Sequence, residues 1–260
     1  MTNYVLLSDV HGPVLDTHLG TETLMEGSIS SMRYLKNHMD SGKEPRIIAV
    51  VTGDSEPTIQ QHFRHVGIKI EYGVFEHGLG IKLPGKNVLP VYDVDSRYEW
   101  LREPVEQLAQ LSVKLKRDMP NNRHSDKLFF VAPYKPDYMS PENFKEYIKY
   151  HVDGFLDMSK FDFKYSHGAV DILPKGANKR IGVIVLKDMP ELRNAMIYGL
   201  EDNNWEWLVE SHYAMCPTPS SDETLNYVGG REENGTGKIL RGDYSNMVIK
   251  QAIELIQHEI

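Results

Sequence analysis

Short apolar runs that end in turn residues alternate along this chain with segments of helical periodicity. Residues 3–9 (NYVLLSD) and 45–54 (PRIIAVVTGD) predict buried strands, because both are short, rich in branched side chains and closed by polar residues. Apolar residues recur at helical spacing over 24–39 and again over 55–66. The order strand, helix, strand, helix indicates a parallel sheet with right-handed crossovers.

The middle of the chain has a different pattern. Helical periodicity is found near 98–115 and near 144–155. Each stretch is followed by a predicted strand, first 127–134 (KLFFVAPY) and then 160–173 (KFDFKYSHGAVDIL). This order of helix, strand, helix and strand predicts a small α+β module.

The α/β pattern resumes in the last third of the chain. We expect a helix at 178–187, a strand at 194–200, a helix at 204–210, a strand at 213–219 and a final helix at 244–257. The sequence therefore predicts an α/β fold in which a Rossmann-like core with a parallel sheet carries an inserted α+β cap. The core is expected to comprise 1–84 and 178–260, and the cap 85–177.

Composition and charge restrict the class of protein. The formal charge is −8, and Lys and Arg do not line up on one helix face, which argues against a nucleic-acid binder. The apolar runs are too short to cross a bilayer, so no membrane segment is expected. The single cysteine, Cys216, excludes an internal disulfide framework and is typical of a reducing compartment. We expect a cytoplasmic protein, and the sequence leaves its oligomeric state open.

Polar residues follow the predicted strands where those strands end. Asp9 follows the first strand, Thr52-Gly53-Asp54 closes the second, and GLEDNN (199–204) follows a late strand. Ligands of parallel sheets bind beyond the carboxyl ends of the strands. An aspartate nucleophile needs a cation that attracts phosphate, donors that hold its oxygens, and an acid or base. Asp9, Thr52, the acids of GLEDNN and Lys179, at the start of a predicted helix, are candidates for this set.

Four stretches in this order resemble the motifs of one family, the haloacid dehalogenase (HAD) superfamily. LLSDVHGPVLDT (6–17) resembles its first motif, a strand ending in Asp-x-Asp-Gly-Thr, and VVTGD (50–54) its second. VDILPKGANKRIG (170–182) is similar to the third motif of the Cof-type and sugar-phosphatase branch. IYGLEDNNWEWL (197–208) stands in place of the fourth. The resemblance covers nearly the whole chain.

The resemblance implies a role for each matching position. Asp9 would attack phosphorus and become a transient aspartyl-phosphate, while Thr52, Gly53 and Lys179 would bind the phosphoryl oxygens. Mg²⁺ would be held by Asp9, the backbone carbonyl of His11 and a residue of the fourth motif, since hard cations take oxygen ligands. The residues of the fourth motif that offer such ligands are Glu201, Asp202 and, as a neutral ligand, Asn204. The cap would select the substrate, a small phosphorylated metabolite such as a sugar phosphate.

The chain departs from the family pattern at several positions. His11 replaces the acid that protonates the leaving group, and its imidazole is suited to acid–base work near neutral pH. Pro13 replaces a threonine, Leu200 stands where a metal-binding aspartate is expected, and Asn204 replaces a second aspartate. Two hypotheses therefore remain open. One is an active Mg²⁺-dependent phosphatase, and the other is a degenerate HAD-like protein that binds a phosphorylated ligand or a protein partner without turnover.

Three further residues are expected to have structural roles. Asp54 is expected to cap the helix at 55–66, because an aspartate there satisfies free backbone N–H groups. Trp205 and Trp207 are expected to pack a helix against the sheet.

Overall fold

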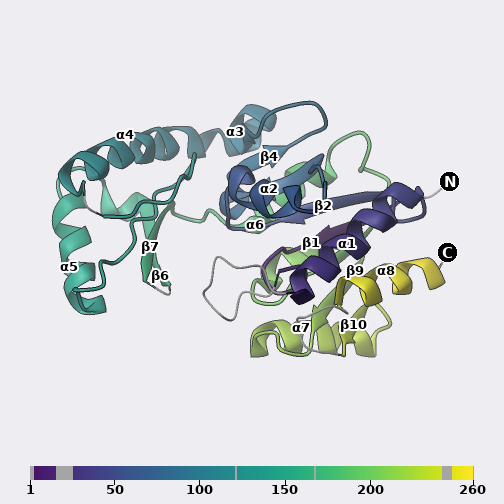
Figure 1. The fold of residues 1–260 in the computed structure, drawn as a ribbon. Helices are drawn as coiled ribbons and strands as arrows, with labels where there is room; N and C mark the ends of the chain where they lie inside the picture. Colours follow the sequence, from purple (N-terminus) through teal and green to yellow (C-terminus); the bar gives the residue numbers. More distant parts are fainter. Residues whose placement is uncertain (1–2, 16–25, 121, 167, 242–247, 260) are drawn as a thin grey trace. The chain divides into compact units, whose positions relative to one another are not determined.

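The structure is a computed structural model that describes residues 3–15, 26–120, 122–166, 168–241 and 248–259. The chain divides into two compact units (Figure 1). One comprises Met1–Leu89 together with Lys179–Ile260, and the other comprises Pro90–Asn178. None of the helices in the described ranges is long and apolar enough to cross a membrane.

The first unit is built on an eight-stranded sheet of order β10-β9-β8-β1-β2-β3-β4-β5. Its strands are β1 (Tyr4–Ser8), β2 (Ile47–Val51), β3 (Tyr72–Phe75), β4 (Gly80–Lys82), β5 (Leu89–Pro90), β8 (Met196–Leu200), β9 (Tyr213–Pro217) and β10 (Gly237–Leu240). Neighbouring strands from β10 to β3 are parallel, and β4 is antiparallel to β3. This mostly parallel sheet confirms the predicted α/β class.

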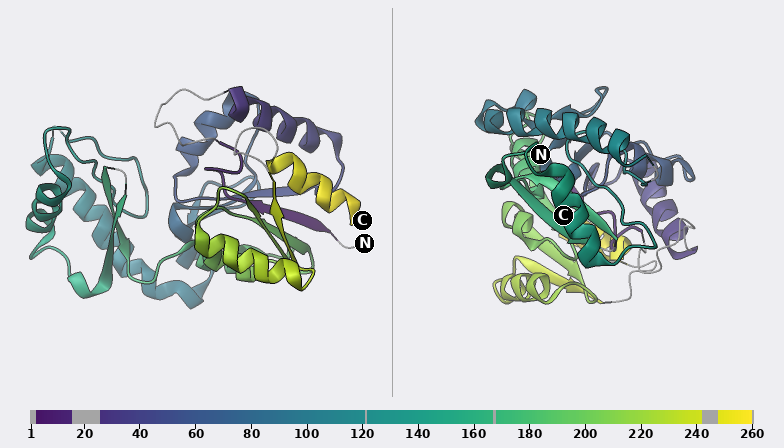
Figure 2. Two further views of the ribbon diagram at one scale, coloured as in Figure 1. Left: turned by 90° about the horizontal axis from the view of Figure 1, so that it is seen from below. Right: turned by 90° about the vertical axis from the view of Figure 1, so that its left-hand side faces the viewer.

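Helices cover both faces of this sheet (Figure 2). A core of buried apolar side chains joins one face to α1 (Glu26–Ser41), α2 (Glu56–Arg64) and α8 (Val248–His258). The other helical segments are α6 (Lys179–Lys187), the 3-10 helix η4 (Trp205–Glu210) and α7 (Asp222–Glu233); a short 3-10 turn, η1 (Glu76–Gly78), joins β3 to β4. Of these, α6 packs on β3 and η4, and α7 packs on β9 and β10. Because β1 is covered on both sides, its residues from Val5 to Ser8 are all buried, which explains its continuous apolar run.

The register of the central strands brings their ends to one level. Ser8 in β1 pairs with Val50 in β2 and with Leu200 in β8. The residues that follow these three strands therefore meet at the same edge of the sheet. The candidate site lies there.

The second unit is an α+β module. Its helices are α3 (Val91–Val94), η2 (Ser96–Leu101), α4 (Arg102–Asp118), α5 (Pro141–Val152) and η3 (Met158–Lys160), and its antiparallel hairpin is β6 (Phe161–Ser166) with β7 (Ala169–Pro174). The single strand predicted for 160–173 is thus two strands, with Gly168 at φ 90° in the turn between them. The strand predicted for 127–134 is wrong. This segment makes only isolated bridges, to β7 and to His124, and its Pro133 has no N–H to donate to a ladder.

Other expected elements differ in type or extent. The helix expected at 204–210 is the 3-10 helix η4. The last helix begins at Val248, and the part of its predicted range over 244–247 lies outside the described residues. The sequence interpretation missed α7 and β10. The segment that forms α7 contains two adjacent glycines, Gly229 and Gly230, which disfavour a helix on propensity alone.

Candidate active site

Asp9 is the first residue after β1, and its carboxylate is buried. Its backbone N–H donates to the carbonyl of Leu200 at 2.8 Å, which continues the pairing of β1 with β8 by one residue. Its Oδ1 accepts the N–H of Val10 at 2.8 Å. The residue is 5 % exposed. The end of a buried strand thus presents a carboxylate held by its own backbone.

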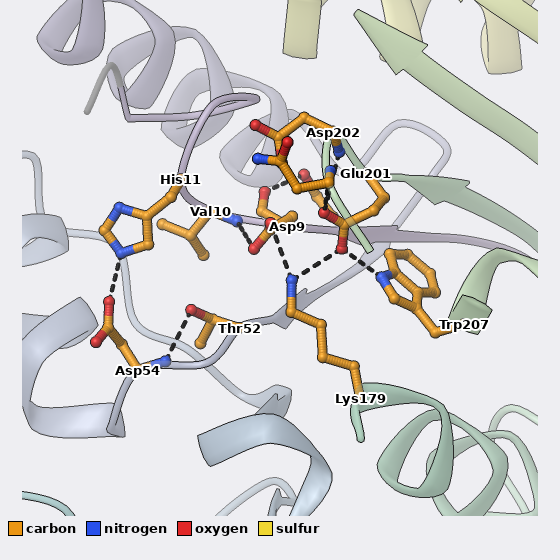
Figure 3. Close-up of polar contacts among 11 residues, drawn as sticks. Asp9, Val10, His11, Thr52, Asp54, Lys179, Glu201, Asp202 and Trp207 are labelled. Atoms are coloured by element: carbon orange, nitrogen blue, oxygen red, sulfur yellow. Dashed lines mark hydrogen bonds and ion pairs between the residues drawn. The ribbon is translucent and has the colours of Figure 1, made fainter. Parts of the chain in front are cut away.

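Lys179 opens α6 and reaches two carboxylates (Figure 3). Its Nζ lies 3.0 Å from Asp9 Oδ2 and 2.8 Å from Glu201 Oε2. The lysine side chain is 7 % exposed, so the contacts form away from bulk water, where charges interact more strongly. The helix that was predicted to begin near 178 therefore places the ammonium of Lys179 beside Asp9 at the end of β1.

Glu201 follows β8 and is fully buried, with 0 % exposure. Its Oε1 accepts the backbone N–H groups of Asp202 and Asn203, each at 3.0 Å. Its Oε2 accepts the indole N–H of Trp207 at 2.5 Å in addition to the lysine contact. The carboxylate is therefore held by backbone and side-chain donors together.

Asp9, Glu201 and Asp202 form a buried carboxylate group that resembles a cation site. Each offers an oxygen within 4.8 Å of the others, and Asp202 is 4 % exposed. Carboxylate oxygens are the ligands that hard divalent cations such as Mg²⁺ prefer. The donor set fits such an ion.

Proximity of like charges and burial shift the pKa values of this group. Burial, and then the charge of Glu201, raise the pKa of the Asp9 carboxyl well above its usual range, although Lys179 opposes the change. Burial also tends to raise the pKa of Glu201, but the charge of Lys179 and the hydrogen bonds from Asp9, Lys179 and the Asn203 backbone together outweigh it and lower that pKa to about 2. The neighbouring carboxylates raise the pKa of Lys179 in spite of its burial. The lysine therefore stays charged.

Thr52 and Gly53 follow β2 beside Asp9. Thr52 is fully buried, and its Oγ1 accepts the backbone N–H of Asp54 at 3.1 Å. A Cβ on Gly53 would lie 2.7 Å from Cε1 of His77, so a larger residue here would require that ring to shift. His77 itself has φ 57°, an uncommon backbone conformation for a residue other than glycine.

His11 points toward Asp54 in Figure 3. Its Nε2 lies 2.5 Å from Asp54 Oδ2. Burial tends to lower the pKa of His11, but the hydrogen bond and the charge of Asp54 outweigh it, and the pKa is raised. The expected capping role of Asp54 is wrong, because Ser55 occupies the N-cap of α2.

Solved structures with this fold were found by structural comparison. Sucrose-phosphatase from Synechocystis, determined with sucrose and phosphate, has 17 % identity and a TM-score of 0.55 over 99 % of this chain and 98 % of its own. A phosphatase of the HAD superfamily from Bacteroides thetaiotaomicron has 15 % identity and a TM-score of 0.51 over 99 % and 95 %. A Plasmodium vivax protein named as a HAD/COF-like hydrolase has 12 % identity and a TM-score of 0.58 over 99 % and 96 %.

The chain has the fold of the HAD superfamily. No family model matches its sequence, and no curated protein does. At this level of identity the likeness is one of fold, so the chemistry of the site has to be argued from its own residues.

The four HAD-like motifs occupy the ends of β1 and β2, the start of α6 and the end of β8. Among the predicted site residues, the structure brings together Asp9, Lys179, Glu201 and Asp202. Leu200 is the last residue of β8 and packs in the apolar core. Asn204 precedes η4, and its side chain makes no capping hydrogen bond there.

Two residues of the candidate site have contacts that the sequence does not predict. Trp207 is buried, with 1 % exposure, in η4, which packs on α6, and its indole N–H donates to Glu201. Asp54 binds His11 instead of capping a helix. Neither contact can be predicted from the local sequence, because the two partners of each contact lie in different segments of the chain.

Proposed function

We propose that this protein is a Mg²⁺-dependent phosphatase that hydrolyses a small phosphorylated metabolite, with a sugar phosphate as the expected substrate class. The observation that carries the proposal is the contact of Lys179 Nζ with Asp9 Oδ2 inside the buried carboxylate group. A carboxylate nucleophile needs such a cation to accept a phosphate dianion beside it. The sucrose and phosphate bound to the Synechocystis neighbour support the sugar-phosphate class.

The proposed reaction has two steps. Asp9 attacks phosphorus, the bond to the leaving oxygen breaks, and an aspartyl-phosphate forms. Water then attacks this phosphorus, which releases inorganic phosphate and restores the carboxylate. Lys179, the Thr52 hydroxyl and the Gly53 backbone hold the phosphoryl oxygens. Mg²⁺, when bound by the acids of the site, offsets the negative charge of the phosphate.

His11 is the proposed proton carrier. It donates a proton to the leaving oxygen in the first step and accepts one from water in the second. Its Asp54 partner favours the protonated ring, as the raised pKa of His11 indicates. This form is the one that the first step requires.

A second candidate function is binding of a phosphorylated ligand or a protein partner without turnover. It is supported by the bond between His11 Nε2 and Asp54, which engages one of the two ring nitrogens. It is also supported by the hydrogen bonds that already surround the Glu201 carboxylate. Both features are compatible with a site that can still bind a ligand and has no catalytic activity.

The test is phosphate release from sugar phosphates, nucleotides and an aryl phosphate, measured with and without Mg²⁺. We expect metal-dependent release that falls by at least about a thousandfold in Asp9→Asn, because the nucleophile is removed. Asp40→Asn is the matched control, since this acid lies on α1 with its side chain 61 % exposed. Release that persists in Asp9→Asn contradicts the mechanism. No release by the wild type from any compound favours binding without turnover.

A further inference from the structure

The carboxylate of Glu201 has its acceptor positions filled by the protein itself. An ionised carboxylate offers about four lone-pair sites. Four donors occupy them, namely the backbone N–H groups of Asp202 and Asn203 on Oε1, and Lys179 Nζ and Trp207 Nε1 on Oε2. With 0 % exposure, the side chain is enclosed by these partners. A metal ion could bind Glu201 only by displacing one of them.

Asp9 differs from Glu201 in this respect. It receives two donors, a backbone N–H on Oδ1 and the Lys179 ammonium on Oδ2, against the four around Glu201, and its carboxyl also contacts that of Glu201. Asp202 is the other member of the buried carboxylate group. Glu201 is therefore the member of the group from which an ion can least easily take a ligand, and Asp9 and Asp202 are the remaining carboxylates of the group.

Trp207 is held against α6 by the packing of its own helical segment. It belongs to η4, which contacts α6, and Glu210 at the end of η4 accepts Lys187 and Arg180 from α6. The indole N–H and Lys179 Nζ converge on the same oxygen, Oε2 of Glu201 (Figure 3). Lys179 has three N–H groups, and Asp9 and Glu201 take two of them in the described part of the chain. The third is left for a phosphate oxygen.

We propose that Glu201 and Trp207 are positioning residues that hold Lys179 at Asp9 for phosphate binding, and that Asp9 and Asp202, not Glu201, supply the carboxylate ligands of the metal. This assignment rests on the proposed function and divides the acidic group into two roles. Glu201 positions Lys179, and Asp202 binds the metal ion. Trp207 acts only through Glu201.

The experiment measures binding of Mg²⁺ alone, and of inorganic phosphate in the presence of Mg²⁺, by calorimetry on the full chain. In Trp207→Phe, which keeps an aromatic ring and removes the N–H, we expect phosphate binding to weaken about five- to tenfold, with Mg²⁺ affinity within about threefold of the wild type. Asp202→Asn should weaken Mg²⁺ binding by tenfold or more, and Glu201→Gln by less than threefold. Trp205→Phe is the matched control: this ring lies in the same η4 and stacks on Tyr227 at 5.0 Å, so both affinities should be unchanged.

Three results would overturn the assignment. The first is a loss of Mg²⁺ affinity in folded Glu201→Gln as large as that in Asp202→Asn. The second is a Trp207→Phe variant that is less stable but binds phosphate as the wild type does, since that result marks a purely structural tryptophan. The third is wild-type protein that binds neither ion, which also removes the proposed function. If both ions bind as expected but no substrate is hydrolysed, the assignment stands and the phosphatase proposal fails.

Discussion

The ammonium of Lys179 lies 3.0 Å from Oδ2 of Asp9, and each of the two side chains is only 7 % exposed. The two residues are far apart in the sequence and meet because α6 begins where β1 ends. Burial of ionised groups is costly unless they are paired and hydrogen-bonded. Lys179 is therefore expected to stabilise the fold as well as to bind the phosphoryl oxygens.

Replacement of Lys179 by methionine tests this dual role. The change leaves Glu201 buried without its cation, and we expect the free energy of unfolding to fall by about 3 kcal/mol. Urea unfolding at pH 8 measures it. The control is Lys238→Met, because Lys238 and Glu232 form an exposed pair that should contribute less than about 1 kcal/mol. Equal losses in the two variants would contradict a buried, compensated pair.

The pair formed by His11 and Asp54 should make stability depend on pH. The pKa of His11 is raised in the folded protein, so the pair stabilises the fold fully below the unfolded pKa of about 6.5 and loses this effect as pH rises through the folded value. The advantage of the wild type over Asp54→Asn should be largest near pH 6 and shrink toward pH 9. Because the two side chains are 34 % and 30 % exposed, we expect it not to exceed about 1 kcal/mol.

Urea midpoints of the two proteins, measured from pH 5.5 to pH 9, check this sign. Contributions of other groups that titrate alike in both proteins cancel in the difference. A difference that grows with rising pH would contradict the pairing of His11 with Asp54.

Gly182 allows α6 to approach β3, and through it Lys179 to approach Asp9. A Cβ at this position would lie 3.1 Å from Gly78 Cα and would also meet the side chain of Val74. Either the backbone at Gly78 or the helix α6 would therefore have to shift. We expect Gly182→Ala to cost about 2 kcal/mol and to reduce phosphate release.

The matched control is Gly230→Ala in α7, where nothing lies within 4 Å of the added Cβ. This variant should be neutral or more stable by up to about 1 kcal/mol, because alanine favours helix. Urea unfolding and phosphate release, measured on both variants, separate the two cases. If Gly182→Ala behaves like Gly230→Ala, the close approach of α6 to β3 is not required for stability or for phosphate release.

Local pattern was sufficient for the central strands of the core. The runs that form β1, β2 and β8 are continuous and apolar, since parallel strands are buried on both faces, and the sequence marks them clearly. Pattern failed where contacts outside the segment decide the structure. Residues 127–134 have the composition of a strand and yet make only isolated bridges, and α7 forms despite two glycines because it packs on β9 and β10.

The sequence by itself determined which chemical groups stand at the strand ends, because a residue's type and its place after an apolar run are both local properties. Asp9, Thr52 and Lys179 could be named from that information alone. Only the tertiary structure decided which donor reaches which acceptor. The bonds from Trp207 to Glu201 and from His11 to Asp54 depend on strand register and on helix packing, and these arise from long-range burial that spacing along the chain does not encode.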